Sequence, residues 1–156
     1  MDRILLWALL IIGMVLLFIS LRKPLIKDMV LVYLMKGYIS SFFGIIVAEE
    51  KWVEYPVRFL GQYFKTSIIF EYFLYPIMCV YLYRTSYRSS FLGIIVQCAL
   101  YASAMTILEV VCEKYTNLVK YHTWTWMYSF LTIFLLSFMV RMLMQWINKR
   151  EQQLKG

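Results

Sequence analysis

The chain has 156 residues, of which 62% are hydrophobic and 16% are charged, and its formal net charge is +7 at pH 7. A soluble domain is about 45–50% apolar and about 25% charged, so this composition excludes a water-soluble globule and a disordered chain. Surplus Lys and Arg residues in a membrane protein anchor its loops on the cytoplasmic side. We therefore expect a lipid bilayer, and no nucleic acid, as the partner of this chain.

Apolar stretches of about 20 residues are long enough to span a membrane as helices. The sequence predicts an all-α bundle of five transmembrane helices in a single domain, residues 1–156. These helices cover about 4–21, 29–48, 66–83, 90–111 and 123–147. Arg22, Lys23 and Pro24 end the first helix, and no cleavage site of small residues precedes them. We expect this helix to be retained rather than removed as a signal peptide.

The positions of Lys and Arg predict the orientation, because the cytoplasmic flanks of membrane helices are richer in these residues. With the N-terminus outside, the flanking segments place eight of them on the inner side and six on the outer side. The inner ones are Arg22, Lys23, Lys27, Arg84, Arg88, Lys149, Arg150 and Lys155. We therefore expect an N-out, C-in topology.

The longest segment between predicted helices, residues 49–65, has the sequence EEKWVEYPVRFLGQYFK. It mixes charged side chains with Trp and Tyr rings, which favour the headgroup layer of a membrane. We expect an outer interfacial segment, either a helix or a broken helix, in which Pro56 favours a turn or a helix start. A lid or a re-entrant element over an outer cavity is the alternative.

Charged residues inside the predicted spans are informative, because a Lys, Arg or Asp at the centre of a bilayer costs about 2.5–3.5 kcal/mol. Glu71 in the third span and Glu109 in the fourth both fall in the outer leaflet when depth is counted at about 1.5 Å per residue. Arg58 and His122 lie near the outer helix ends, and tyrosines can donate hydrogen bonds to carboxylates. We hypothesise an outward-facing binding site formed by Glu71, Glu109, Arg58, His122 and Tyr72.

A structural role is the alternative for these two carboxylates. Glu71 and Glu109 would then pair with Arg58, with Lys65 or with a Tyr hydroxyl and fix the helices to one another. Glu113 lies one helical turn after Glu109 on the same face, and we expect it to have this structural role.

The second predicted helix carries Gly37, Ser41 and Gly44 on one face, a spacing that lets helices approach closely in membranes. We expect helix packing or self-association at this face. Lys36 on the same helix is expected to extend its ammonium group toward the inner surface, and a buried pair with a carboxylate is the alternative. Arg141 is expected at the inner headgroup boundary.

The sequence lacks the motifs of common catalytic and cofactor sites. It contains no G-x-S-x-G, H-E-x-x-H or C-x-x-C pattern, no glycine-rich phosphate loop and one His. We expect no cofactor, no metal site and no catalytic residues. The three cysteines, Cys79, Cys98 and Cys112, are expected to be small packing residues.

Several of these residues also form a spaced pattern. Pro56-x-Arg58 is followed by Glu71-Tyr72 with Pro76, then by Glu109, and then by Tyr121 ahead of Trp124-x-Trp126. The pattern resembles a family of small multi-pass membrane proteins of endospore-forming Gram-positive bacteria. This resemblance implies a bacterial plasma membrane and a five-helix plan, and it carries no catalytic residues to transfer.

We expect a non-enzymatic membrane protein whose outward-facing site at Glu71 and Glu109 binds a small cation, an amine, a lipid headgroup or a membrane partner. A channel or a proton-coupled transporter, with a homo-oligomer formed through the small-residue face as one form, is the main alternative. It would need a polar path to the inner side through Lys36 and Arg141. A lipid-modifying enzyme is the third alternative, because two carboxylates can act as general acid and base.

Overall fold

The computed structural model describes residues 1–22 and 25–156. Lys23 and Pro24, which we expect to end the first helix, lie outside the described residues. The described chain is all-helical apart from a short pair of strands. In chain order its elements are α1 (Asp2–Leu21), α2 (Ile26–Glu49), β1 (Val53–Glu54), the π-helix η1 (Ile69–Leu74), α3 (Tyr75–Ser86), α4 (Phe91–Tyr115), β2 (Lys120–Tyr121) and α5 (Trp126–Lys155).

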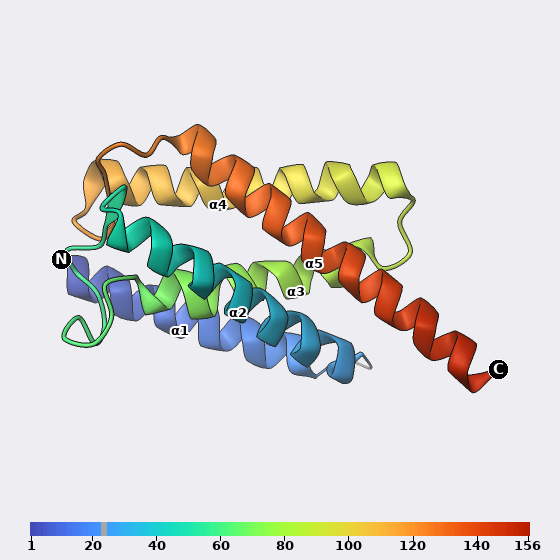
Figure 1. Cartoon of the computed structure of the whole chain (residues 1–156). Helices are drawn as coiled ribbons and strands as arrows, with labels where there is room; N and C mark the ends of the chain where they lie inside the picture. The colour runs from blue at the N-terminus through green and yellow to red at the C-terminus, as the bar shows by residue number, and fades with distance from the viewer. Residues whose placement is uncertain (23–24) are drawn as a thin grey trace.

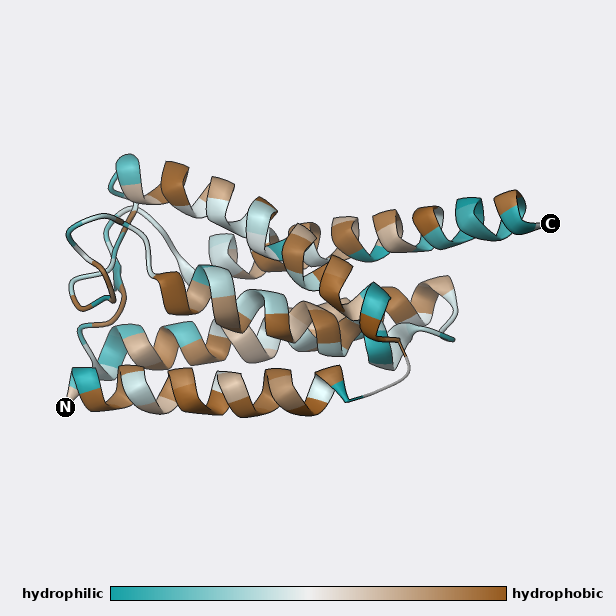
Figure 2. Cartoon of the chain, turned by 90° about the horizontal axis from the view of Figure 1, so that it is seen from below, coloured by the Kyte–Doolittle hydropathy of each residue, from teal (hydrophilic) through white to brown (hydrophobic). Residues whose placement is uncertain are grey.

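Successive helices run antiparallel, so their connections gather at two ends of the bundle (Figure 1). The N-terminus, the α2–η1 segment and the α4–α5 segment lie at one end, which we call the cap end. The α3–α4 connection and the C-terminus lie at the opposite end, which we call the tail end. Helix α5 crosses the bundle obliquely, and its last turns extend beyond the other helices (Figures 1 and 2).

Four helices of the described chain, α1, α2, α4 and α5, are long and apolar enough to cross a membrane. Large apolar side chains cover their outer surfaces, such as Trp7, Phe42 and Leu100, each of which is more than half exposed. Charged side chains such as Lys36 and Arg141 are buried inside instead. This distribution suits a lipid environment, because water favours the reverse arrangement.

The third predicted helix, about 66–83, has two parts in the structure, η1 followed directly by α3. Within η1 the N–H of Tyr75 donates to the carbonyl of Phe70, five residues earlier. Pro76 has no N–H and therefore leaves a carbonyl of the preceding turn without its helical donor. Such wide turns occur where a proline or another residue disturbs the helical ladder, and they often mark functional sites.

Side chains of α2 stabilise this turn. The Tyr33 hydroxyl donates to the carbonyl of Tyr72, and the Ser40 hydroxyl donates to the carbonyl of Glu71 over 2.9 Å. These bonds replace helical ones and hold η1 against α2. The backbone of Glu71 is thereby fixed in the interior of the bundle.

The small-residue face of α2 packs within the chain. Gly37, Ser41 and Gly44 are buried. Gly37 lies next to Pro76, and Gly44 lies next to the Glu71 side chain. The close approach that these residues allow is therefore used between α2 and the η1–α3 unit.

At the cap end, β1 pairs antiparallel with β2, with Val53 opposite Tyr121 and Glu54 opposite Lys120. The side chains of this cap that face the helices are buried, namely Val53, Tyr55, Leu118 and Val119. The described segment 50–67 consists of turns, irregular chain and one strand, which corrects the expectation of an interfacial helix. Val53 and Tyr55 of this segment are buried against the bundle.

Candidate binding cavity

A cavity of about 50 Å³ lies between α2, η1, α3, α4 and α5, beneath β1 and β2. One water molecule needs a cavity of about 15 Å³, so this cavity has space for roughly three water molecules. Glu71 and Glu109 both line it, as does Lys36. The structure therefore brings the two predicted carboxylates to one cavity and adds a lysine to them.

Glu71 reaches the cavity from the π-helix. Its side chain is buried and lies against Gly44 of α2, where the absence of a Cβ leaves space for the carboxylate. No ion pair within 4 Å joins Glu71 to a base in the described part of the chain. Its negative charge is therefore not neutralised by direct contact.

Glu109 reaches the cavity from α4 and is held by a chain of hydrogen bonds. The Trp124 indole N–H donates to the Ser129 hydroxyl over 2.7 Å, and the oxygens of Ser129 and Tyr121 lie 3.2 Å apart. The Tyr121 hydroxyl donates to Glu109 Oε2 over 2.8 Å. Because an indole N–H can only donate, it directs the Ser129 proton onward toward the tyrosine and carboxylate.

The Tyr121 phenol is suited to this role. Burial and the negative charge of Glu109 raise the pKa of Tyr121 above its ordinary value of 10.0. The hydroxyl therefore keeps its proton and remains a donor at physiological pH. The contact of Glu109 with a Tyr hydroxyl, which its structural alternative includes, is present.

Lys36 is 1% exposed, although we expect it to extend toward the inner surface. It lines the same cavity as the carboxylates, because it lies two turns before Gly44 on the buried face of α2. In the residues that the structure describes, its ammonium group forms no ion pair within 4 Å. The expectation for Lys36 is therefore corrected to burial.

Three charged groups thus face one small cavity in a region of low dielectric. If all three are ionised, Glu71 and Glu109 carry two negative charges and Lys36 carries one positive charge. Buried charges are normally paired or hydrogen-bonded, because isolated ones are strongly unfavourable. In that fully ionised state, one additional positive charge would balance the cavity.

The other predicted site residues lie outside this cavity. Arg58 donates to the carbonyls of Tyr55, Gly61 and Phe64, so it organises its own loop. His122 Nε2 lies 3.0 Å from Glu54 Oε2 on the outer side of the cap. Arg58 and His122 border a separate groove of about 490 Å³. Tyr72 is partly exposed and contributes only its backbone carbonyl to the α2 contact.

Arg141 is buried between α5 and the end of α3. Its Nε and Nη2 atoms donate to the Oγ and the carbonyl of Ser86 over 2.8 and 2.9 Å. The guanidinium carbon lies 5.3 Å from the centre of the Tyr83 ring. These contacts join α5 to the end of α3, which explains how the charge is accommodated inside.

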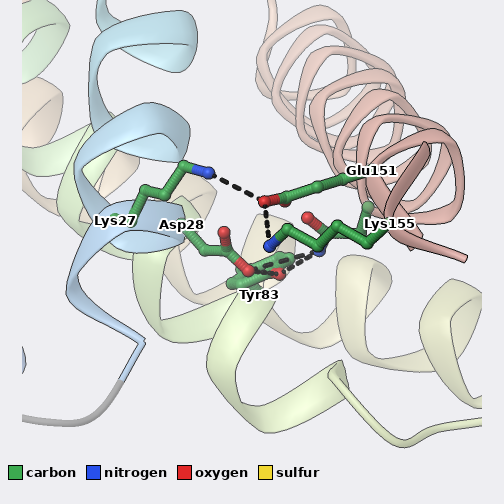
Figure 3. A network of polar contacts seen from close by, with 6 residues as sticks. Lys27, Asp28, Tyr83, Glu151 and Lys155 are labelled. Atoms are coloured by element: carbon green, nitrogen blue, oxygen red, sulfur yellow. Dashed lines mark hydrogen bonds and ion pairs between the residues drawn. The ribbon is translucent and has the colours of Figure 1, made fainter.

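A second polar cluster closes the tail end. Asp28 Oδ2 accepts hydrogen bonds from the Tyr83 hydroxyl over 2.6 Å and from the Asn148 amide over 3.2 Å. Glu151 lies beside them and pairs with Lys27 and Lys155 (Figure 3). Helices α2, α3 and α5 are therefore joined by polar contacts far from the cavity.

Sequence reasoning missed the aromatic and hydroxyl residues of the cavity, above all Tyr121, Trp124 and Ser129. Tyr121 and Trp124 belong to a segment whose aromatic content is typical of a membrane interface. Ser129 is a single hydroxyl in an apolar helix. No periodicity in the sequence predicts that these residues lie next to Glu109. Their positions depend on how the α4–α5 segment folds back over the bundle.

In the described ranges, no group of three or more His, Cys, Asp and Glu side chains is placed to hold a metal ion. Comparisons of the chain with protein families, with curated proteins and with solved structures find no match. The chemistry of this site is therefore inferred from the geometry of the cavity.

Proposed function

We propose that the chain is an integral membrane protein of five transmembrane helices that binds one small monovalent cation in the cavity. The observation that carries this proposal is the presence of two buried carboxylates and one lysine around a single small space. One bound monovalent cation makes the charges of the cavity sum to zero. A lipid headgroup is too large for a space of about 50 Å³.

The fifth span of this proposal is the continuous helical unit of η1 and α3, with 6 and 12 residues. At about 1.5 Å per residue it is roughly 27 Å long, close to the thickness of a hydrocarbon core. An N-out, C-in orientation is supported by the basic residues at the tail end, which include Arg84, Arg88 and Lys155. The sequence resemblance supports a bacterial plasma membrane.

Calorimetric titration of the purified full-length protein in detergent tests the cation site. Chlorides of monovalent cations are titrated at constant ionic strength into the wild type, Glu71→Gln and Glu109→Gln. We expect saturable binding that each variant weakens at least tenfold. Glu113→Gln is the matched control, because Glu113 lies on α4 outside the cavity lining. Absence of saturable binding by the wild type would contradict the proposal.

Proton-coupled transport is a second candidate function. Two basic side chains, Lys36 beside the cavity and Arg141 at the end of α3, are buried inside the bundle. Reconstituted vesicles with an internal pH dye test this candidate. Proton flux that Glu71→Gln abolishes would support it, and vesicles that remain tight over a range of pH and voltage would contradict it.

A further inference from the structure

The walls of the cavity carry aromatic rings as well as carboxylates. Phe43, Tyr55, Tyr75, Tyr121 and Trp124 all line it. The face of an aromatic ring attracts cations, ammonium groups among them. A site for a strongly hydrated metal ion would instead present a shell of oxygen atoms.

The oxygen atoms of the cavity belong to two carboxylates and several hydroxyls. Glu71 and Glu109 supply four carboxylate oxygens, and Oε2 of Glu109 already accepts the Tyr121 hydroxyl. Ser129 and Thr132 add hydroxyl oxygens to the walls. These acceptors can satisfy the N–H bonds of an ammonium group, which need about three.

The volume of the cavity limits the size of its occupant. A space of about 50 Å³ holds roughly three water molecules. An ammonium group with one or two carbon atoms matches this space, whereas a quaternary ammonium or a polyamine exceeds it.

Lys36 already contributes one ammonium group to the cavity wall. Its side chain is itself a primary alkylammonium group, and it lines the same walls as Glu71 and Glu109. Because Lys36 neutralises only one of the two carboxylates, the remaining charge matches one further ammonium group of the same kind.

We propose that the cavity binds a small primary ammonium ion, either ammonium itself or a short alkylammonium such as methylammonium. This inference rests on the proposed function, because it names the class of cation that the site takes. Its ammonium group donates to the Glu71 and Glu109 carboxylates, and its alkyl group and positive charge lie against the aromatic rings.

A selectivity series on the wild-type protein tests the inference without depending on any variant. Methylammonium, ammonium, tetramethylammonium, K⁺ and Na⁺ chlorides are titrated separately into the detergent-purified chain, with binding followed by calorimetry. We expect methylammonium to bind at least tenfold more tightly than K⁺ and Na⁺, and tetramethylammonium not to compete with it. Binding of K⁺ or Na⁺ with no response to methylammonium overturns this inference but leaves the cation site in place. Absence of binding by all five overturns both.

A variant of the aromatic wall supplies the second readout. Tyr75→Leu removes a ring while keeping apolar volume, and we expect it to weaken methylammonium binding about threefold to thirtyfold. Tyr38→Leu is the matched control, because Tyr38 is exposed on α2 and does not line the cavity. Equal loss in both variants, or no loss in Tyr75→Leu, contradicts a role of the aromatic wall. If Tyr75→Leu does not fold, the wild-type selectivity series still decides.

Discussion

Gly44 of α2 lies so close to the carboxylate of Glu71 that any side chain at position 44 would collide with it. A Cβ atom built at position 44 would lie 2.6 Å from Cδ and 2.7 Å from Oε1 of Glu71. The residue that appears in the sequence as part of a helix-packing motif therefore also provides the space for a buried charge. Packing and site geometry depend on the same glycine.

We expect Gly44→Ala to displace the Glu71 carboxylate, to lower the free energy of unfolding by about 1–3 kcal/mol through overpacking, and to weaken cation binding. Unfolding by heat in detergent, followed by calorimetric titration, measures both effects. Gly37→Ala is the matched control. A Cβ at position 37 would lie 3.6 Å from Pro76 Cγ, an ordinary contact, and alanine favours the helix by about 1 kcal/mol. Equal behaviour of the two variants would contradict the role of Gly44.

Arg141 offers a test at the opposite end of the bundle. Its two hydrogen bonds to Ser86 require the planar fork of a guanidinium group, which lysine lacks. We expect Arg141→Lys to lower the free energy of unfolding by about 1.5–3 kcal/mol, the range of a hydrogen bond to a charged group.

Arg150→Lys is the control for this change, since Arg150 is exposed on the same helix. We expect it to alter stability by less than about 0.5 kcal/mol, as surface substitutions usually do. Thermal unfolding of both variants in the same detergent gives the comparison. An Arg141→Lys variant as stable as the control would show that the Ser86 contacts contribute little.

The positions of the long helices follow from the sequence, because apolar stretches of this length have few other stable structures in a membrane. The shared location of Glu71 and Glu109 also follows, since their depths can be counted along two helices. The same count does not predict that Lys36 and Arg141 are buried. It gives the depth of a residue but not the helix face that contacts the interior, and both residues lie on buried faces.

The cap could not be predicted for a different reason. Its structure depends on pairing between segments separated by more than 60 residues, with Val53 opposite Tyr121. Neither segment has the alternating pattern of a strand, and their aromatic residues are equally typical of a membrane interface. The contacts of Tyr121 with Glu109 therefore become visible only in the folded chain.

The Glu54–His122 pair predicts how the stability of the cap depends on pH. The hydrogen bond from His122, aided by the charges of Lys120 and Arg58, lowers the pKa of Glu54 below its ordinary value of 4.5. A carboxyl group whose pKa is lower in the folded state than in the unfolded state stabilises the folded state when the pH is above the pKa of the unfolded state. The contribution is lost as the pH falls through the lower, folded value.

We therefore expect the wild type to melt at a slightly higher temperature than Glu54→Gln at pH 6, with the difference disappearing as the pH falls well below 4.5. Melting temperatures of both proteins at pH 3 to 6 give this comparison. Glu50→Gln serves as the control, because Glu50 is exposed near the cap and is not in contact with His122. A difference that persists unchanged at the lowest pH would contradict the assignment.

The charge balance of the cavity predicts a non-additive effect of two substitutions. Lys36 and Glu71 are buried within electrostatic reach of each other, although they form no direct ion pair in the described part of the chain. Lys36→Met leaves two carboxylates without a positive charge, so we expect it to lower the free energy of unfolding by several kcal/mol, up to the ~3–5 kcal/mol of a broken buried pair. Adding Glu71→Gln removes one of those charges and should restore part of the loss. A double-mutant cycle in detergent should therefore show a coupling of about 0.5–3 kcal/mol, whereas strict additivity would mean that the two groups do not share the cavity electrostatically.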